Sequence, residues 1–221
     1  MKKNFQFMVA VGLLVGPIAS QAVPIVHTTD FIAEAERTNF NSFETMFEFY
    51  DGSIPYVEDG IRVQQINDDP GLDIWTGSFS NYDGAHGWYV NGGDYGYTSL
   101  SLADGSDFGD MGFYISGTYH QWAFFELLDD GAVVLSGSVA HPSPFHYLGF
   151  AGGGFDTVLL RDGVAGSTLH DGTYNAITLD AIETRPASVT VPEPGTLALF
   201  GFGIAGLGFV RHRRKQPSVL M

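Results

Sequence analysis

Two carboxylates near opposite ends of the central segment could together bind a hard cation. Glu44 follows Phe43 in a stretch expected to form an early strand, and Asp180 lies in the stretch expected to form the last one. The first and last strands of an antiparallel sandwich commonly pair, and carboxylate oxygens are ligands that Ca²⁺ prefers. We therefore predict a structural Ca²⁺ site at Glu44 and Asp180. Two ordinary outward-facing strand carboxylates are the alternative.

A second group of candidate residues combines aromatic and polar side chains in a glycine-rich stretch. Its members are His86, Trp88, Asn91 and Asp94. Aromatic faces stack on the C–H faces of sugars, while amide and carboxylate groups bind sugar hydroxyls. These residues predict a neutral-sugar site in a loop, although a solvated loop that only supports the fold would use the same residue types.

Other patterns that could carry chemistry are weak. His141 and His146 lie in a proline-bearing loop, but no carboxylate stands beside them at metal-ligand spacing. Residues 201–206 read G-x-G-x-x-G, yet they lie in an apolar tail and not between a strand and a helix. The chain has no cysteine, no nucleophile elbow, no zinc-protease helix and no phosphate loop. We therefore predict no enzymatic activity.

These candidate residues must be positioned by short strands. Apolar or aromatic runs alternate with Gly, Asp and Asn clusters, which is typical of an antiparallel β-sandwich. The clearest hairpin turns at Asp130-Gly131, and residues 31–37 could form one short helix capped by Thr29 or Asp30. The predicted fold is all-β and jelly-roll-like over residues 23–190. The predicted strands span residues 42–49, 61–66, 97–102, 111–116, 121–128, 132–139, 155–160 and 176–182.

Two short motifs of this domain resemble a known class of protein. Phe43-Glu44 near the start and residues 179–182 near the end are similar to motifs of calcium-stabilised carbohydrate-binding jelly rolls. In those proteins a structural calcium ion takes a Glu and an Asp at corresponding places. The resemblance therefore implies the same calcium role for Glu44 and Asp180.

The N-terminus has the three parts of a secretory signal peptide. Lys2 and Lys3 precede an apolar stretch at residues 5–18, and small residues follow at Ser20 and Ala22. The apolar stretch is too short for a membrane span. We predict that residues 1–22 are removed by cleavage after Ala22.

The C-terminus combines a proline motif, an apolar run and a basic end. The motif keeps the chain extended, so a helix can begin only after it. Residues 197–210 can then form a single membrane helix whose basic end stays cytoplasmic. The motif is Val191, Pro192, Glu193 and Pro194, and the basic residues are Arg211, Arg213, Arg214 and Lys215.

Residues 191–215 resemble the PEP-CTERM sorting domain in motif, helix and basic cluster. The resemblance implies recognition by an exosortase, a membrane-embedded protease or transpeptidase. Proteins with this tail are linked with exopolysaccharide and biofilm production in Gram-negative bacteria. A plain membrane anchor is the alternative.

The charge distribution restricts the partners of the domain. Six of the ten basic residues lie at the two ends, so four arginines face 25 carboxylates in between. Such a surface repels nucleic acid. We predict an exported, non-enzymatic protein with a polysaccharide-associated role, anchored in the inner membrane as a precursor and then moved to the cell surface or matrix. A secreted glycoside or ester hydrolase and a structural envelope protein without a ligand are the alternatives.

Overall fold

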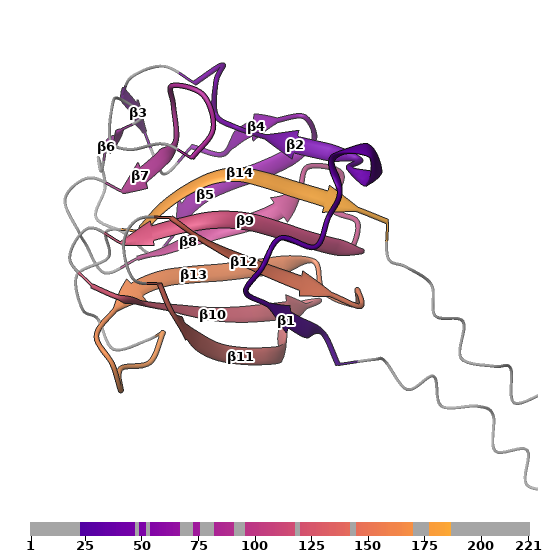
Figure 1. The fold of residues 1–221 in the computed structure, drawn as a ribbon, viewed down its shortest axis with the longest axis vertical. Coiled ribbons are helices and arrows are strands. Elements are labelled where there is room, and N and C mark those ends of the chain that lie inside the picture. The colour runs from indigo at the N-terminus through magenta and orange to yellow at the C-terminus, as the bar shows by residue number, and fades with distance from the viewer. Residues whose placement is uncertain are drawn as a thin grey trace, which may run out of the picture. The chain divides into compact units, whose positions relative to one another are not determined.

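The domain between the two ends of the chain is built from strands (Figure 1). Residues 21–189 form one compact unit. The computed structural model describes residues 23–46, 49–51, 54–66, 73–75, 82–90, 96–117, 120–141, 145–169 and 177–186. One turn of 3-10 helix, η1 (Glu34–Glu36), is the only helix among them. The strands are β1 (Ile25–His27), β2 (Asn39–Asn41), β3 (Phe49–Asp51), β4 (Tyr56–Glu58), β5 (Ile61–Ile66), β6 (Asp73–Trp75), β7 (Trp88–Val90), β8 (Tyr97–Leu102), β9 (Asp110–Gly117), β10 (Trp122–Asp129), β11 (Ala132–Ala140), β12 (His146–Ala151), β13 (Thr157–Gly163) and β14 (Ile177–Arg185).

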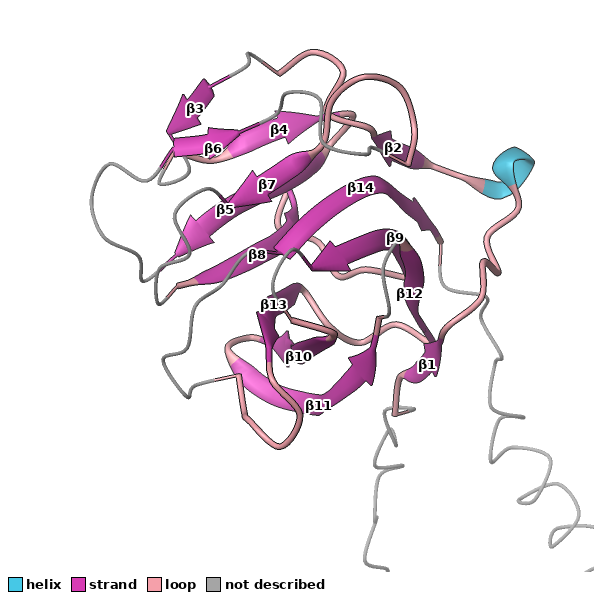
Figure 2. Cartoon of the chain, turned by 60° about the vertical axis from the view of Figure 1, so that its left-hand side comes forward, coloured by secondary structure: helices cyan, strands magenta, loops and turns pink. Residues whose placement is uncertain are grey.

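The strands form two antiparallel sheets, which confirms the predicted sandwich (Figure 2). The eight-stranded sheet has the order β1-β12-β9-β14-β7-β6-β3, and β2 also pairs with β14. The six-stranded sheet has the order β11-β10-β13-β8-β5-β4. The strand β2 lies beside β14, so the last strand pairs with residues 39–41, just before the segment predicted to be its neighbour.

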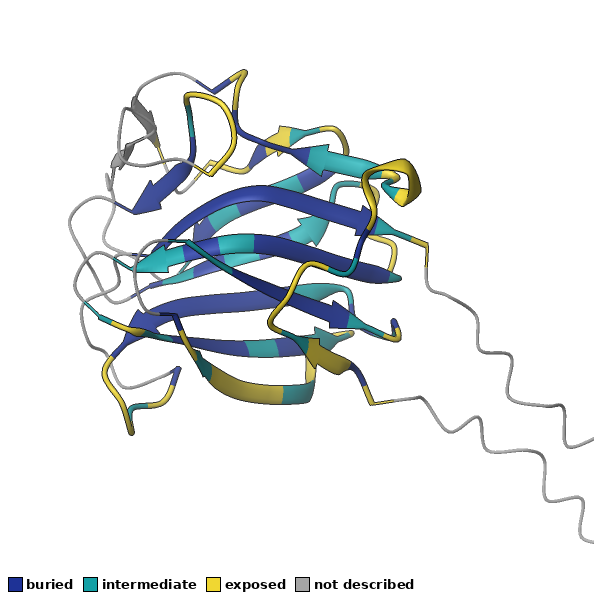
Figure 3. Ribbon diagram, viewed as in Figure 1, coloured by how far each residue is buried: buried dark blue, intermediate teal, exposed yellow. Residues whose placement is uncertain are grey.

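The core fills the space between the two sheets. Figure 3 shows in dark blue the buried residues, which make up most of the long strands. Side chains alternate along each strand, because successive Cβ atoms point to opposite faces. On β9, Phe113 faces the core while its neighbour Tyr114 faces outward. Phe125 of the smaller sheet meets Phe150 of the larger sheet, with 5.0 Å between ring centroids. This aromatic contact joins the two layers.

Two tight hairpins arise from the same dipeptide. Asp130 and Gly131 have φ angles of 49° and 79° and join β10 to β11, which confirms the predicted hairpin. Asp59 and Gly60 have φ angles of 44° and 77° and join β4 to β5. Positive φ at both central residues defines the type I′ turn, whose twist matches that of paired strands.

The strand predicted at residues 42–49 is wrong. The strand β2 ends at Asn41, whose side-chain oxygen accepts the N–H of Phe43 at 3.1 Å. Phe43 then adopts φ of 62°, and the N–H of Met46 bonds to the Phe43 carbonyl at 3.0 Å. This local turn replaces a continuous strand and places Glu44 on a loop.

The helix predicted at residues 31–37 is also wrong, apart from the single turn η1. No side chain caps η1, and Asp30 instead accepts the N–H of Ile32 at 3.2 Å. Phe31 is held on the sheet surface, stacked on His27 with ring centroids 4.1 Å apart. Phe31 also meets the ring of Tyr147 edge-on, with 6.1 Å between ring centroids, and this tertiary contact overrides the local helix preference.

The longer predicted strands are confirmed within a few residues at each end, and β5 and β8 match their predicted bounds. Seven strands were missed. Six of them have only three residues, too few to show an alternating pattern. The missed strands are β1, β2, β3, β4, β6, β7 and β12.

Candidate functional site

A bulge in β14 brings two carboxylates to the outer face of the eight-stranded sheet. Asp180 lies opposite Tyr114 of β9, whereas Glu183 lies opposite Gly112, so β14 has one extra residue between the two pairs. The extra residue is accommodated at Ala181, which has φ of 48°. Because of the bulge, Asp180 and Glu183 share the face on which Tyr114 lies.

Glu44 and Asp180 are brought to the same short loop, residues 82–86. The carboxylate of Asp180 accepts the N–H groups of Tyr82 at 2.7 Å and Asp83 at 2.8 Å. The carboxylate of Glu44 accepts the N–H groups of Ala85 at 2.7 Å and His86 at 2.9 Å. The two carboxylates therefore hold the loop by four backbone hydrogen bonds.

Gly84 permits this close approach. A Cβ atom at this position would lie 2.2 Å from Oε1 of Glu44, and Gly84 itself has φ of 63°. Any other residue would clash with the carboxylate or strain the backbone. The sequence Gly84-Ala85-His86 is thus suited to bind a carboxylate through its backbone.

A calcium ion at Glu44 and Asp180, as the sequence predicted, would have to bind beside these backbone hydrogen bonds. Ca²⁺ needs six to eight oxygen ligands, whereas Oε1 of Glu44 and Oδ2 of Asp180 each face two N–H donors. Within the described residues, no group of three or more His, Cys, Asp or Glu side chains could hold a metal ion. Calcium binding stays a prediction, and equal melting midpoints with calcium and with chelator would rule it out.

The two carboxylates differ in their pKa. Burial acts to raise the pKa of Glu44, but the N–H groups of His86 and Ala85 together outweigh it, so this pKa lies below its usual value. Asp180 is fully buried. Removal from water disfavours the charged form of Asp180 and raises its pKa to about 6. The backbone N–H groups of Asp83, Ala181 and Tyr82 favour the charged form, but their effect is smaller.

We expect the domain to lose stability as the pH rises through 6. The unfolded pKa of Asp180 is 3.8, so between 3.8 and 6 the folded state binds the proton more tightly than the unfolded state. The free energy of unfolding should therefore be higher at pH 5 than at pH 8, by roughly 1 kcal/mol from Asp180. Urea denaturation across this range measures it. A wild-type slope equal to that of Asp180→Asn would contradict the assignment.

Next to this loop lies a hollow with two aromatic rings, here called the Tyr82 hollow. Its volume is about 500 Å³. Tyr82 is 51% exposed and stacks on Tyr114, with ring centroids 3.3 Å apart and an interplanar angle of 11°. The guanidinium of Arg37 lies 4.7 Å from the centroid of Phe40. The lining residues are Glu34, Arg37, Phe40, Tyr82, Asp83 and Ala181.

Arg37 also belongs to a buried hydrogen-bonded network beside the Tyr82 hollow. Glu183 is 1% exposed, forms an ion pair with Nε of Arg37 at 2.5 Å and accepts the hydroxyl of Tyr147 at 2.9 Å. Burial raises the pKa of Glu183, although Tyr147 and Arg37 act to lower it. Both carboxylate oxygens of Glu183 therefore have partners, and Arg37 is fixed at the rim of the Tyr82 hollow.

The sugar site predicted around Trp88 is wrong at its central residue. Trp88 is 0% exposed and packs in the core, 6.1 Å from the ring of Phe43, so its ring cannot stack on a sugar. Trp88 is the first residue of β7 and does not lie in the predicted loop. His86 is partly exposed, and its Nδ1 lies 3.7 Å from Oε2 of Glu44. Asn91 and Asp94 lie outside the described residues.

The structure gives no support to the histidine pair. His141 is fully buried, with Nε2 3.3 Å from Oδ1 of Asp162, and His146 begins β12. Sequence reasoning also missed Tyr82, Phe40 and Arg37. The one signal was the position of Tyr82 beside Asp83, in a loop already rich in polar residues.

Both ends of the chain fall outside the described residues. These are the predicted signal peptide at 1–22, the sorting segment at 191–215 and its apolar run. Within the part of the chain that the structure describes, no helix is long and apolar enough to cross a membrane.

Comparison with known proteins gives two kinds of match, and no curated protein matches the chain. Several solved carbohydrate-binding modules of family 29 are similar over most of the domain, at TM-scores below 0.5. One such module is 14% identical, covering 72% of this chain and 96% of its own, with a TM-score of 0.38. A mutant of the second family 29 module, complexed with cellulohexaose, has 14% identity, 72% and 99% coverage and a TM-score of 0.38. The first module, from Piromyces equi, has 15% identity, 64% and 91% coverage and a TM-score of 0.34.

The second match concerns the C-terminus. The family model of the PEP-CTERM protein-sorting motif matches residues 190–215. This agrees with the motif, apolar run and basic end in the sequence. The chain therefore carries the PEP-CTERM sorting motif of an exported protein.

Proposed function

We propose that this protein is sorted by an exosortase to the cell surface, where its sandwich binds neutral polysaccharide without cleaving it. The binding site would be the Tyr82 hollow on the outer face of the eight-stranded sheet. The sorting motif at residues 190–215 supports the first part of the proposal. The geometry around Tyr82 supports the second.

The observation that carries the binding proposal is the exposed ring of Tyr82 on a fixed support. Tyr114 lies flat beneath the ring, and the backbone of Tyr82 is bonded to Asp180. A ring held in this way offers an apolar face with little loss of conformational freedom on binding. Sugar rings present C–H faces that pack on such a surface.

The polar groups around the hollow suit a neutral ligand with many hydroxyls. Asp83 and Glu34 can accept hydrogen bonds from hydroxyls, and Arg37 can donate to them. Two carboxylates against one guanidinium would repel an anionic polymer. The shape and chemistry of the hollow therefore favour an uncharged glycan chain.

The hydrolase alternative would need a carboxyl group with a raised pKa that is open to substrate. Asp180 and Glu183 have raised pKa values and lie near aromatic rings. However, Asp180 accepts three backbone N–H bonds, and Glu183 is bound by Arg37 and Tyr147. These contacts make both carboxylates structural supports, which favours binding over cleavage.

Replacing Tyr82 by alanine should weaken glycan binding by about thirtyfold, because the stacking surface is the main apolar contribution of the site. Binding of the domain to immobilised neutral polysaccharides, such as β-glucan, mannan and xylan, measures the effect. Tyr82→Phe is the matched control, since it keeps the ring and loses only the hydroxyl. It should bind nearly as well as the wild type.

Three results would overturn the proposal. They are equal binding by Tyr82→Ala and the wild type, an absence of binding to every neutral polysaccharide tested, and release of reducing sugar ends by the wild type. Because Tyr82 is half exposed, the melting midpoint of Tyr82→Ala should change little, so lost binding would report on the site.

A further inference from the structure

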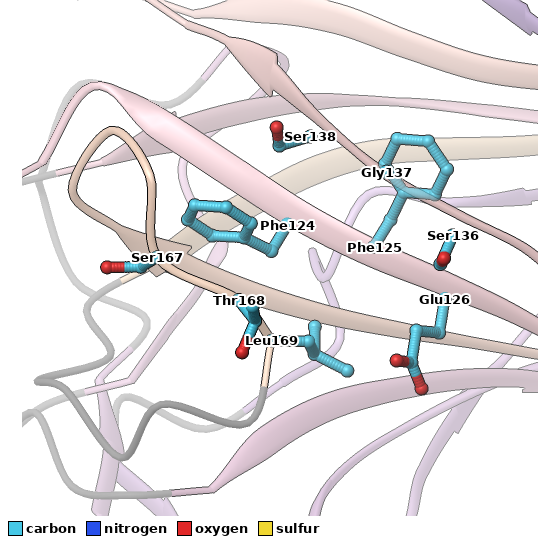
Figure 4. A pocket seen from close by; sticks show the side chains of 9 residues that line it. All are labelled: Phe124, Phe125, Glu126, Ser136, Gly137, Ser138, Ser167, Thr168 and Leu169. Atoms are coloured by element: carbon cyan, nitrogen blue, oxygen red, sulfur yellow. The ribbon is translucent and has the colours of Figure 1, made fainter.

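The outer face of the six-stranded sheet carries a second pocket, here called the β10–β11 pocket (Figure 4). Its volume is about 420 Å³. Two cross-strand pairs form its floor, Phe124 opposite Ser138 and Glu126 opposite Ser136. Residues 167–169 form one wall. The lining residues are Phe124, Phe125, Glu126, Ser136, Gly137, Ser138, Ser167, Thr168 and Leu169.

Leu169 anchors the wall of this pocket. Leu169 is 4% exposed and packs on Phe124 and Leu159, in a small cluster separate from the main core. The buried guanidinium of Arg161 donates to the carbonyl of Leu169 at 3.0 Å. A pocket with rigid walls loses little freedom on binding, so weak polar contacts can contribute to affinity.

The lining chemistry indicates the class of ligand. Ser136, Ser138, Ser167 and Thr168 supply hydroxyl groups, each able to donate and to accept. Among the lining residues that the structure describes, Glu126 is the single charged one and none is basic. An anion would find no positive partner, and a divalent cation would find only one carboxylate. Phe124 is 5% exposed and packs under Leu169, so the hydroxyl groups form the accessible part of the lining. A neutral ring with several hydroxyls matches these groups.

We propose that the β10–β11 pocket binds one neutral sugar ring, such as the end of a polysaccharide chain. Its volume lies within the range of small-ligand pockets. The pocket and the Tyr82 hollow lie on the outer faces of different sheets, separated by the core. If the proposed function holds, the domain has two glycan sites on opposite faces and links two polysaccharide chains.

Ligand-detected NMR with methyl glycosides of neutral hexoses tests the second site by itself. The measurements use residues 23–189, the compact unit with its own core, carrying Tyr82→Ala so that the first site is removed. Adding Ser138→Tyr fills the pocket from an exposed position and should weaken binding by about tenfold or more. Adding Ala140→Tyr is the matched control, because Ala140 pairs with Trp122 on the same face but does not line the pocket.

The expected result is saturation transfer to the sugar in Tyr82→Ala and in the Ala140→Tyr control, and its loss in the Ser138→Tyr protein. If the Ser138→Tyr protein does not fold, Glu126→Gln replaces it and should weaken binding severalfold. No transfer in Tyr82→Ala, or equal transfer in the pocket variant and the control, overturns the proposal. Because Tyr82 is absent throughout, these outcomes do not depend on the first site.

Cross-linking is read separately, as turbidity of a soluble neutral β-glucan mixed with the domain. The wild type should give turbidity, and Tyr82→Ala or Ser138→Tyr alone should abolish it. Turbidity that persists in Ser138→Tyr contradicts the second site. Binding to immobilised polysaccharide that is unchanged by Tyr82→Ala contradicts the first site and leaves the NMR result for the pocket standing.

Discussion

Replacing Trp88 by alanine is expected to lower the free energy of unfolding by about 3–5 kcal/mol, because a large ring is deleted from a packed core. Trp88 is 0% exposed and lies between the sheets beside Phe43. Its removal leaves a cavity that the surrounding strands cannot close. Urea denaturation of the domain measures the change.

Two further variants separate packing from other effects. Val57 lies on β4 and is 47% exposed. Val57→Ala should therefore change the free energy of unfolding by about 0.5 kcal/mol or less. Trp88→Phe should lower the free energy of unfolding less than Trp88→Ala. Nε1 of Trp88 has no hydrogen-bond partner among the described residues, so this substitution removes only side-chain volume. A cost below about 1 kcal/mol for Trp88→Ala would show that the ring does not support the core.

The part of the fold that local sequence patterns could predict is the set of long strands. In β5, inward Ile61 and Val63 alternate with half-buried Arg62 and Gln64, and this two-residue period is visible in the sequence. Asp130-Gly131 marks its hairpin because glycine tolerates positive φ. Asp59-Gly60 carries the same signal and could have located β4, which was missed.

The errors arise where distant contacts decide the local conformation. Trp88 stands among polar and glycine residues, which favoured a loop, yet β7 pairs with β14 and buries the ring. Phe43 is of a residue type that favours strands. However, its backbone N–H donates to the side-chain oxygen of Asn41, and the chain turns there. Neither the pairing nor the turn can be read from nearby residues alone.

Of the candidate site, the sequence singled out Glu44 and Asp180. Both carboxylates accept N–H groups of the loop at residues 82–86, while their role as calcium ligands stays a prediction. The sequence could not tell that backbone N–H groups of this loop would occupy the carboxylates. For the same reason it did not single out Tyr82, whose ring is placed by the bonds that Asp180 makes to its backbone.

Replacing Pro192, Glu193 and Pro194 together by alanine is expected to abolish C-terminal processing. The two prolines disfavour helix in and just before the motif, so the segment can enter a protease cleft extended. Alanine would let the helix of the following apolar run extend upstream and hide the cleavage site. The wild type should lose its apolar and basic segments in a host with an exosortase and end near Val191. The alanine variant should stay in the membrane at full length.

Mass spectrometry of the C-terminus, with and without the host exosortase, measures this outcome. The matched control replaces Gln216, Pro217 and Ser218 by alanine, because these residues lie beyond the basic cluster and beyond the matched motif. This control should be processed like the wild type, since it keeps the proline motif, the apolar run and Arg211 to Lys215. A protein that still ends at Met221 in both strains would show that residues 190–215 act only as a membrane anchor. Processing of the alanine variant at the wild-type position would instead show that the extended prolines are not what the protease requires.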